Sequence, residues 1–263
     1  MHKIKTIIRK EWAEVFKNRM VLFTVIFLPL FLTVLPLGIL AATNESEGME
    51  AINTQMPEEM SQLCAEGVST SECFPVFIFS IFLLMFMMIP LIIPINIAAY
   101  SIVGEKTTHS LEPLLATPIT TAELLTAKNL AATLPAVLAT WAGFIIFVLG
   151  ALLITGSKAI AGALLDPMWL LAVLLVGPLM AVLSVNFSIM VSSRVNDPRV
   201  AEQASTVVIL PVLLLFFGQL SGMFFLNKTL ILLIALALVV LDLVLIYIAV
   251  RMFQREVILT RWK

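Results

Sequence analysis

Few side chains in this chain are placed where they could perform acid–base, nucleophilic or metal chemistry. The 263 residues include two histidines, His2 and His109, and neither belongs to the His-Glu-x-x-His pattern of metalloproteases; the Gly-x-Ser-x-Gly pattern of serine hydrolases is also absent. The sequence contains no Gly-x-x-x-x-Gly-Lys-Ser/Thr loop, which would cradle ATP phosphates. We therefore expect a chain that is no enzyme, with no catalytic residue, metal site or cofactor of its own.

Three polar residues, Asp242, Asn96 and Asn186, lie inside long apolar stretches. If these stretches cross a membrane, a charge at the middle costs at least about 2–3 kcal/mol, so Asp242 must face protein or water. Asp242 could relay a proton or cation, or contact a transported group; alternatively, it forms a structural hydrogen bond to a neighbouring helix. The two asparagines could share a polar intramembrane site with it, although amides inside membranes often hold helices together.

The apolar stretches are long enough to cross a membrane. Hydrophobic residues make up 60% of the chain and charged residues 13%, which is more apolar side chain than one soluble core of this length could bury. A spanning helix needs about 20 apolar residues, so the sequence predicts an all-α integral membrane protein with six transmembrane helices. The expected spans lie within residues 20–44, 73–104, 129–157, 167–193, 203–227 and 229–250. Within the second, Pro90, Pro94 and the excess length predict a kinked or tilted helix.

The distribution of Lys and Arg predicts the orientation. With six spans, 14 of these residues fall on the side of both termini and two, Lys158 and Lys228, on the other. Because segments near span ends carry excess Lys and Arg on the cytoplasmic side, we expect a multi-pass protein of the cell membrane with cytoplasmic termini. The basic residues stay close to the membrane, so nothing suggests a nucleic-acid surface.

Residues 43–73 are predicted to form an acidic extracytoplasmic loop. Residues 45–72 hold seven glutamates and no Lys or Arg. The only cysteines of the chain, Cys64 and Cys73, lie here, on the side that is oxidising in most cells. We expect a disulfide between them; the alternative is two free thiols at the membrane edge.

Residues 1–19 have the pattern of an amphipathic helix. Six apolar residues recur at helical spacing, with basic residues on the other faces. This pattern predicts a helix on the inner membrane surface, the alternative being a soluble cytoplasmic helix. The apolar residues are Ile4, Ile7, Ile8, Trp12, Val15 and Phe16.

Residues 104–128 form a polar interruption between the second and third spans. Thr120 followed by Glu123 predicts a capping box, so a helix should begin near Thr121 and run into the third span. Upstream, residues 110–117 have the pattern of a short helix that ends before Pro118. Its leucines have no soluble domain of this chain to cover them, which predicts a partner protein. The alternative is a loop that packs on the inner ends of the spans.

This loop resembles that of the type-2 permease subunits of ATP-binding-cassette exporters. The similarity rests on an acidic-basic pair, a Ser-Leu-Glu block, two leucines and a Thr-Pro pair, with His109 where glycine is usual. The matching residues are Glu105, Lys106, Ser110, Leu111, Glu112, Leu114, Leu115, Thr117 and Pro118. The helix before the first span, the large outer loop and the six spans agree with the same family.

The resemblance implies a single permease domain over residues 1–263 that pairs with a second copy, identical or related, and with two copies of a separate ATPase holding ATP and Mg²⁺. The short helix would be the coupling helix that docks in a cleft of the ATPase. Apart from Thr117, the loop residues that carry the resemblance would form this ATPase contact.

Two other functions stay open. The chain could transmit force from an ATPase to an extracytoplasmic partner docked on the acidic outer loop, without moving a substrate through itself. It could instead be an ion-coupled carrier that depends on Asp242. Neither the apolar spans nor their scattered amides identify a substrate.

Overall fold

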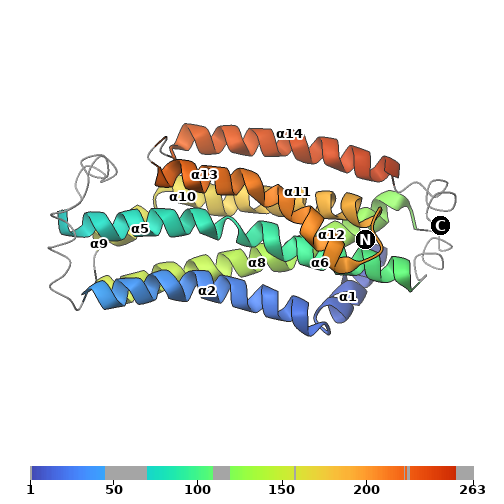
Figure 1. Cartoon of the computed structure of the whole chain (residues 1–263), viewed down its shortest axis with the longest axis horizontal. Helices are drawn as coiled ribbons and strands as arrows, with labels where there is room; N and C mark the ends of the chain where they lie inside the picture. Colours follow the sequence, from blue (N-terminus) through green and yellow to red (C-terminus); the bar gives the residue numbers. More distant parts are fainter. Residues whose placement is uncertain are drawn as a thin grey trace.

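The computed structural model describes residues 2–44, 70–108, 119–156, 158–221, 223 and 226–252, and these residues form helices and short connections with no β-strand. Figure 1 shows the helices running side by side in one elongated bundle. In chain order they are α1 (His2–Val15), α2 (Arg19–Asn44), α5 (Thr70–Phe86), α6 (Ile89–Thr107), α8 (Thr121–Thr155), α9 (Lys158–Leu164), α10 (Pro167–Leu171), the π-helical turn η1 (Ala172–Val176), α11 (Gly177–Ser192), α12 (Pro198–Ser205), the 3-10 turn η2 (Thr206–Ile209), α13 (Leu210–Leu220) and α14 (Lys228–Met252).

Six stretches of this bundle are long and apolar enough to cross a membrane, as the sequence predicts. Their outer faces carry large exposed apolar side chains such as Phe23, Leu153 and Leu214, which suits contact with hydrocarbon. The protein is therefore a multi-pass membrane protein. The six stretches are Val21–Ala42, Ile78–Thr107, Thr121–Thr155, Gly162–Ser192, Pro198–Leu220 and Lys228–Met252.

The second span is interrupted directly before Pro90. α5 ends at Phe86 and α6 begins at Ile89, and between them the N–H of Met88 donates to the carbonyl of Met85 (2.9 Å), three residues back. Pro90 then occupies the first turn of α6, where its missing N–H costs no helical hydrogen bond. The irregularity predicted for this span is thus a break between two helices beside Pro90, whereas Pro94 lies inside α6.

The fourth span contains the π-helical turn η1. The N–H of Gly177 donates to the carbonyl of Ala172, five residues back, and Pro178 has no N–H to offer the carbonyl of Val173. Trp141 on α8 supplies the donor, with its Nε1 3.2 Å from the Val173 oxygen. The π-turn therefore gives α8 a hydrogen bond to the fourth span.

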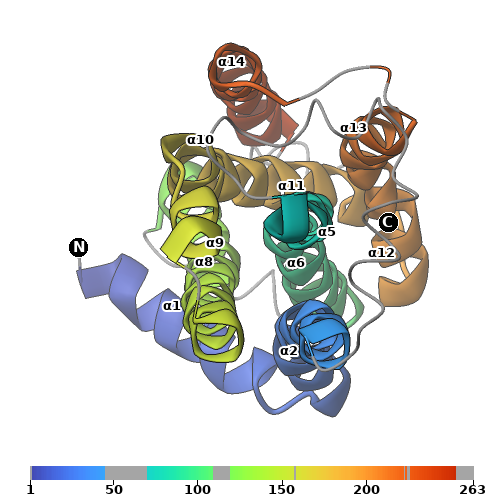
Figure 2. The same ribbon diagram turned by 90° about the vertical axis from the view of Figure 1, so that its left-hand side faces the viewer.

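α6 is the central helix of the bundle. Its residues from Ile93 to Ala99 are buried on every face, as expected for a helix enclosed by others. It packs against α8, α11, α12 and α2, and Figure 2 shows it in the middle of the bundle viewed end-on. α14 is peripheral: it packs mainly on α11 and leaves most of its surface exposed. A movement of α6 would therefore reach most of the spans.

α1 docks on the beginning of α8. Ile7 is buried against Leu124 and Ala127, and Trp12 Nε1 donates to the carbonyl of Ala131 (2.9 Å). The apolar face that the sequence predicts is present, and part of it contacts protein. The location of α1 at the inner membrane surface stays a prediction.

Candidate functional site

A buried group of charged and polar side chains, the charge cluster, joins α1, α6 and α8. Lys128 lies at its centre, with Nζ 2.9 Å from Glu11 Oε1, 2.7 Å from Glu105 Oε2 and 2.8 Å from Ser101 Oγ. Lys128 donates hydrogen bonds to Glu11 Oε1 and Ser101 Oγ, and its contact with Glu105 Oε2 is an ion pair. The Ser101 hydroxyl in turn donates to Glu11 Oε2 (2.5 Å). The side chains of Lys128, Glu11 and Glu105 are only 4%, 3% and 5% exposed.

Lys10 completes the charge cluster on its more exposed side. Its Nζ lies 2.7 Å from Glu105 Oε1 and 3.6 Å from Glu14 Oε1. Burial by itself disfavours the charged form, but the hydrogen bond and negative charge of Glu105 outweigh it and raise the pKa of Lys10. Lys10 and Lys128 balance Glu11 and Glu105, which allows these charges to be buried together.

The capping box that the sequence predicts is present at the start of α8. Thr120 Oγ1 accepts from the N–H of Glu123 (3.2 Å), and Glu123 Oε2 accepts from the N–H of Thr120 (2.9 Å). The helix begins at Thr121, as expected. These bonds fix where the polar loop ends and the third span begins.

The middle of that loop lies outside the described residues. Its predicted short helix and its ATPase contacts therefore stay predictions. The residues concerned are His109, Ser110, Leu111, Glu112, Leu114, Leu115 and Pro118.

Lys106, also predicted to contact the ATPase, reaches the turn between α11 and α12. Its Nζ lies 3.2 Å from the carbonyl oxygen of Ser193 and 3.4 Å from that of Val195. A lysine is favourable at such a helix C-terminus, where carbonyl groups lack helical partners. Lys106 and Glu105 thus both contact their own chain, and their contact with a partner stays a prediction.

A polar groove of about 390 Å³ opens beside the charge cluster. It lies between α1, the turn that follows α1, and the last turns of α6; we refer to it as the α1–α6 groove. Its lining residues are Lys10, Glu11, Glu14, Val15, Asn18, Val21, Tyr100, Ser101, Gly104, Glu105 and Thr108.

The three predicted intramembrane polar residues are all buried, and no hydrogen bond between them is found among the described residues. Asn96 and Asn186 each donate from Nδ2 to the carbonyl four residues earlier in their own helix, Ile92 (3.0 Å) and Val182 (2.9 Å). Neither carboxylate oxygen of Asp242 has a hydrogen-bond partner in the described part of the chain. Their role as a shared polar site stays a prediction.

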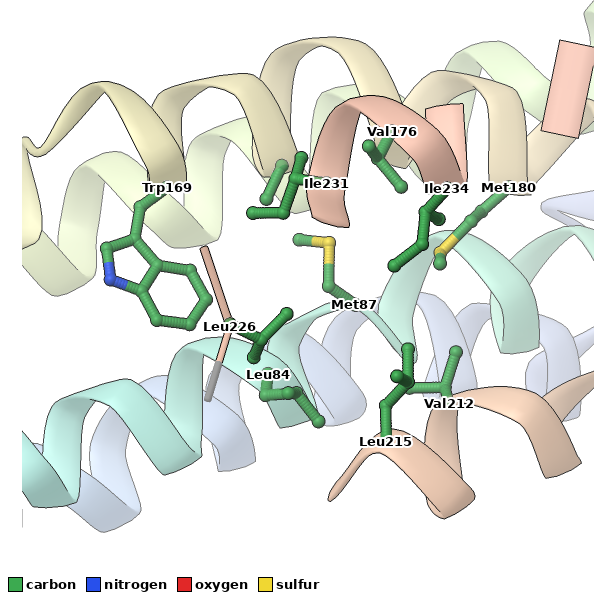
Figure 3. A pocket seen from close by; sticks show the side chains of 11 residues that line it. Leu84, Met87, Trp169, Val176, Met180, Val212, Leu215, Leu226, Ile231 and Ile234 are labelled. Carbon is green, nitrogen blue, oxygen red and sulfur yellow. The ribbon is translucent and has the colours of Figure 1, made fainter. Parts of the chain in front are cut away.

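An apolar pocket lies where the break in the second span faces η1, α13 and α14. Figure 3 shows Met87 and Trp169 pointing into it, across from Ile231 of α14. The accessible space inside it is about 30 Å³.

Comparison with known protein families matches residues 5–254 to the family described as ABC-2 family transporter protein. The match includes most of α1, all six spans and the charge cluster. This chain belongs to the ABC-2 transporter family. The resemblance seen in the polar loop is thereby confirmed. The family is one of membrane permeases, and membership implies association with an ABC ATPase partner. A search of curated proteins found no match.

The predicted disulfide of this ABC-2 chain falls where the structure gives no side-chain information. Cys64 lies outside the described residues, and Cys73 lies in α5 at a position whose side chain is not described. The bond between them stays a prediction.

Sequence reasoning missed the charge cluster, although a local signal pointed to part of it. Glu11 lies on the apolar face of α1, four residues after Ile7 and four before Val15, both buried. Lys128 likewise interrupts a buried face of α8, between Leu124 and Ala131. A charge on an otherwise buried helix face needs a partner of opposite charge. Glu11 and Lys128 each stand out in this way in the sequence.

Proposed function

We propose that this ABC-2 chain is the permease subunit of an exporter, in which a separate ATPase subunit hydrolyses ATP and drives a substrate across the membrane. The complex would contain two permease chains, identical or related, and two ATPase subunits that hold ATP and Mg²⁺. The absence of a phosphate-binding loop from the sequence supports this division of labour.

The orientation belongs to the same proposal. The described Lys and Arg residues lie at the end of the bundle that carries α1, except Lys158 and Lys228, which begin α9 and α14 at the other end. We place the α1 end in the cytoplasm because cytoplasmic segments carry this excess. The polar loop then faces the compartment in which ATP is available.

The observation that carries the proposal is the position of the charge cluster on both sides of the polar loop. Glu105 lies in the last turn of α6, before the loop, and Lys128 lies two turns into α8, after it. Their 2.7 Å ion pair, with Glu11 of α1, holds three helix ends together. A push on the loop would therefore move these ends as a unit.

Lys106 links the end of α6 to a second connection between spans. Through its bonds to the carbonyls of Ser193 and Val195, the end of α6 holds the turn between the fourth and fifth spans. Because α6 also packs against most of the other helices, displacement of its end would change the packing around the bundle centre. This is the behaviour that a permease driven from one side requires.

The decisive experiment changes the loop leucines. Leu114→Asp or Leu115→Asp should abolish co-purification of the ABC ATPase in gentle detergent, because a carboxylate cannot be buried unpaired in an apolar cleft. Membrane insertion should be unaffected. Leu114→Met and Leu115→Ile, which keep apolar volume, should retain the ATPase. Normal ATPase recovery with both aspartate variants would overturn the assignment of this loop as the coupling element.

A further inference from the structure

The α1–α6 groove carries more negative than positive charge. The lining holds three carboxylates, of Glu11, Glu14 and Glu105, and one ammonium group, of Lys10. The buried Lys128, which is not part of the lining, balances one more carboxylate, so one negative charge is left unbalanced. The surplus falls on Glu14, because Lys10 is 2.7 Å from Glu105 but 3.6 Å from Glu14. The side chain of Glu14 is also 57% exposed. The groove is therefore complementary to a single positive charge.

The groove lies at the depth where membrane spans end. Val21, in its lining, begins the first span, and Thr108, also in its lining, follows the last residue of the second. Phospholipid headgroups occupy this depth, at the boundary between hydrocarbon and water. Headgroup amines are cations that occur at this depth.

Positive charge borders the groove on the turn between α1 and α2. Lys17 and Arg19 are both exposed, and they flank Asn18, which lines the groove. Basic residues at a membrane surface attract lipid phosphates. Beyond this turn, α2 carries exposed apolar side chains such as Phe23 and Ile26, which suit contact with acyl chains.

We propose that the α1–α6 groove binds the headgroup of a phosphatidylethanolamine molecule. Its ammonium group enters the groove and donates hydrogen bonds to Glu14 and to the side-chain oxygen of Asn18, while its phosphate meets Lys17 and Arg19. Phosphatidylcholine has the same charges, but its quaternary ammonium has no N–H to donate, so it should bind less well. The lipid would hold α1 against the end of α6, and this does not depend on the proposed transport function.

The test uses the full chain in nanodiscs containing equal amounts of phosphatidylethanolamine and phosphatidylcholine. Lipids retained after gentle extraction are counted by native mass spectrometry. We expect phosphatidylethanolamine to be enriched about two- to fivefold, the range of one exposed charged contact, and Glu14→Gln to remove the enrichment. Glu202→Gln, which removes an acid from α12 at the same end of the bundle, should leave the enrichment unchanged. The double variant Lys17→Gln/Arg19→Gln should lower retention of both lipids alike, because both carry the phosphate.

Two results would overturn the proposal. One is equal retention of the two lipids by the unaltered chain. The other is an enrichment that persists in Glu14→Gln; if that variant also loses the ATPase, the groove instead accepts a basic side chain of the partner protein. Because Glu14 is exposed, an unchanged melting temperature would show that its variant folds. The lipid count needs neither ATPase nor transport, so its result is independent of the proposed function.

Discussion

Lys128 and Glu11 lie 117 positions apart in the sequence, yet Lys128 Nζ is 2.9 Å from Glu11 Oε1. The contact joins the helix before the first span to the third span. Both side chains are almost completely buried, and Lys128 also donates a hydrogen bond to Ser101 and forms an ion pair with Glu105. The position of α1 is therefore set by buried charges as well as by its apolar face.

Removing the ammonium group from the charge cluster should destabilise the protein strongly. Lys128→Met leaves the buried carboxylates of Glu11 and Glu105 without their shared partner, which typically costs about 3–5 kcal/mol. The apparent melting temperature in detergent, followed by tryptophan fluorescence, should fall.

The triple variant Lys128→Met/Glu11→Gln/Glu105→Gln should recover much of that loss, because the only charge left in the charge cluster is the partly exposed Lys10, which keeps Glu14 at 3.6 Å. Lys5→Met, at an exposed position of α1, is the control and should melt as the unaltered chain does. An unchanged melting temperature in Lys128→Met would show that the charge cluster does not stabilise the bundle.

Gly143 should tolerate no large side chain, because it lets α8 approach the second span closely. A Cβ atom there would lie 3.2 Å from Phe86 Cε1, whereas at Gly38 of α2 it would meet nothing within 4 Å. Gly143→Leu should therefore cost about 1–3 kcal/mol of overpacking relative to Gly38→Leu, since both gain the same helix propensity. Melting temperatures of the two variants test this, and equal values would contradict it.

Replacing Asp242 should stabilise the isolated chain. A buried carboxyl group without a hydrogen-bond partner costs about 1–3 kcal/mol, so Asp242→Leu should raise the apparent melting temperature. A lower melting temperature would instead show that Asp242 makes a favourable contact.

Transport assays on Asp242→Asn separate function from stability. If the unaltered chain transports a substrate without ATP and Asp242→Asn does not, the result favours the ion-coupled carrier.

Lys10 should make stability depend on alkaline pH. Because its pKa is raised in the folded chain, protonated Lys10 contributes stability that is complete below the unfolded value of 10.5 and is lost as pH rises through the folded value. Lys10→Arg stays charged throughout. Melting curves from about pH 8 to about pH 11 should show the unaltered chain losing stability relative to Lys10→Arg only at the alkaline end. Parallel curves would argue against the Lys10–Glu105 pair.

Some features were readable from the sequence because they depend on neighbouring residues or on sums along the chain. The free energy of crossing a bilayer adds up residue by residue, so six apolar stretches predict six spans wherever the helices pack. The capping box links Thr120 to Glu123, three residues away, and needs no tertiary contact. The break before Pro90 follows from the missing N–H of proline.

Other features required the packed structure. The rotation of each helix about its own axis, and the neighbours that it contacts, depend on how all the helices fit together. No local sequence pattern contains that information. Lys106, expected to face a partner, reaches the carbonyl of Ser193, and Asn96 bonds to its own helix. The sequence by itself determined the membrane class, the number of spans and the family resemblance. Only the tertiary structure decided that Glu11, Glu105 and Lys128 meet, because ion pairs between distant residues form only after helices have packed.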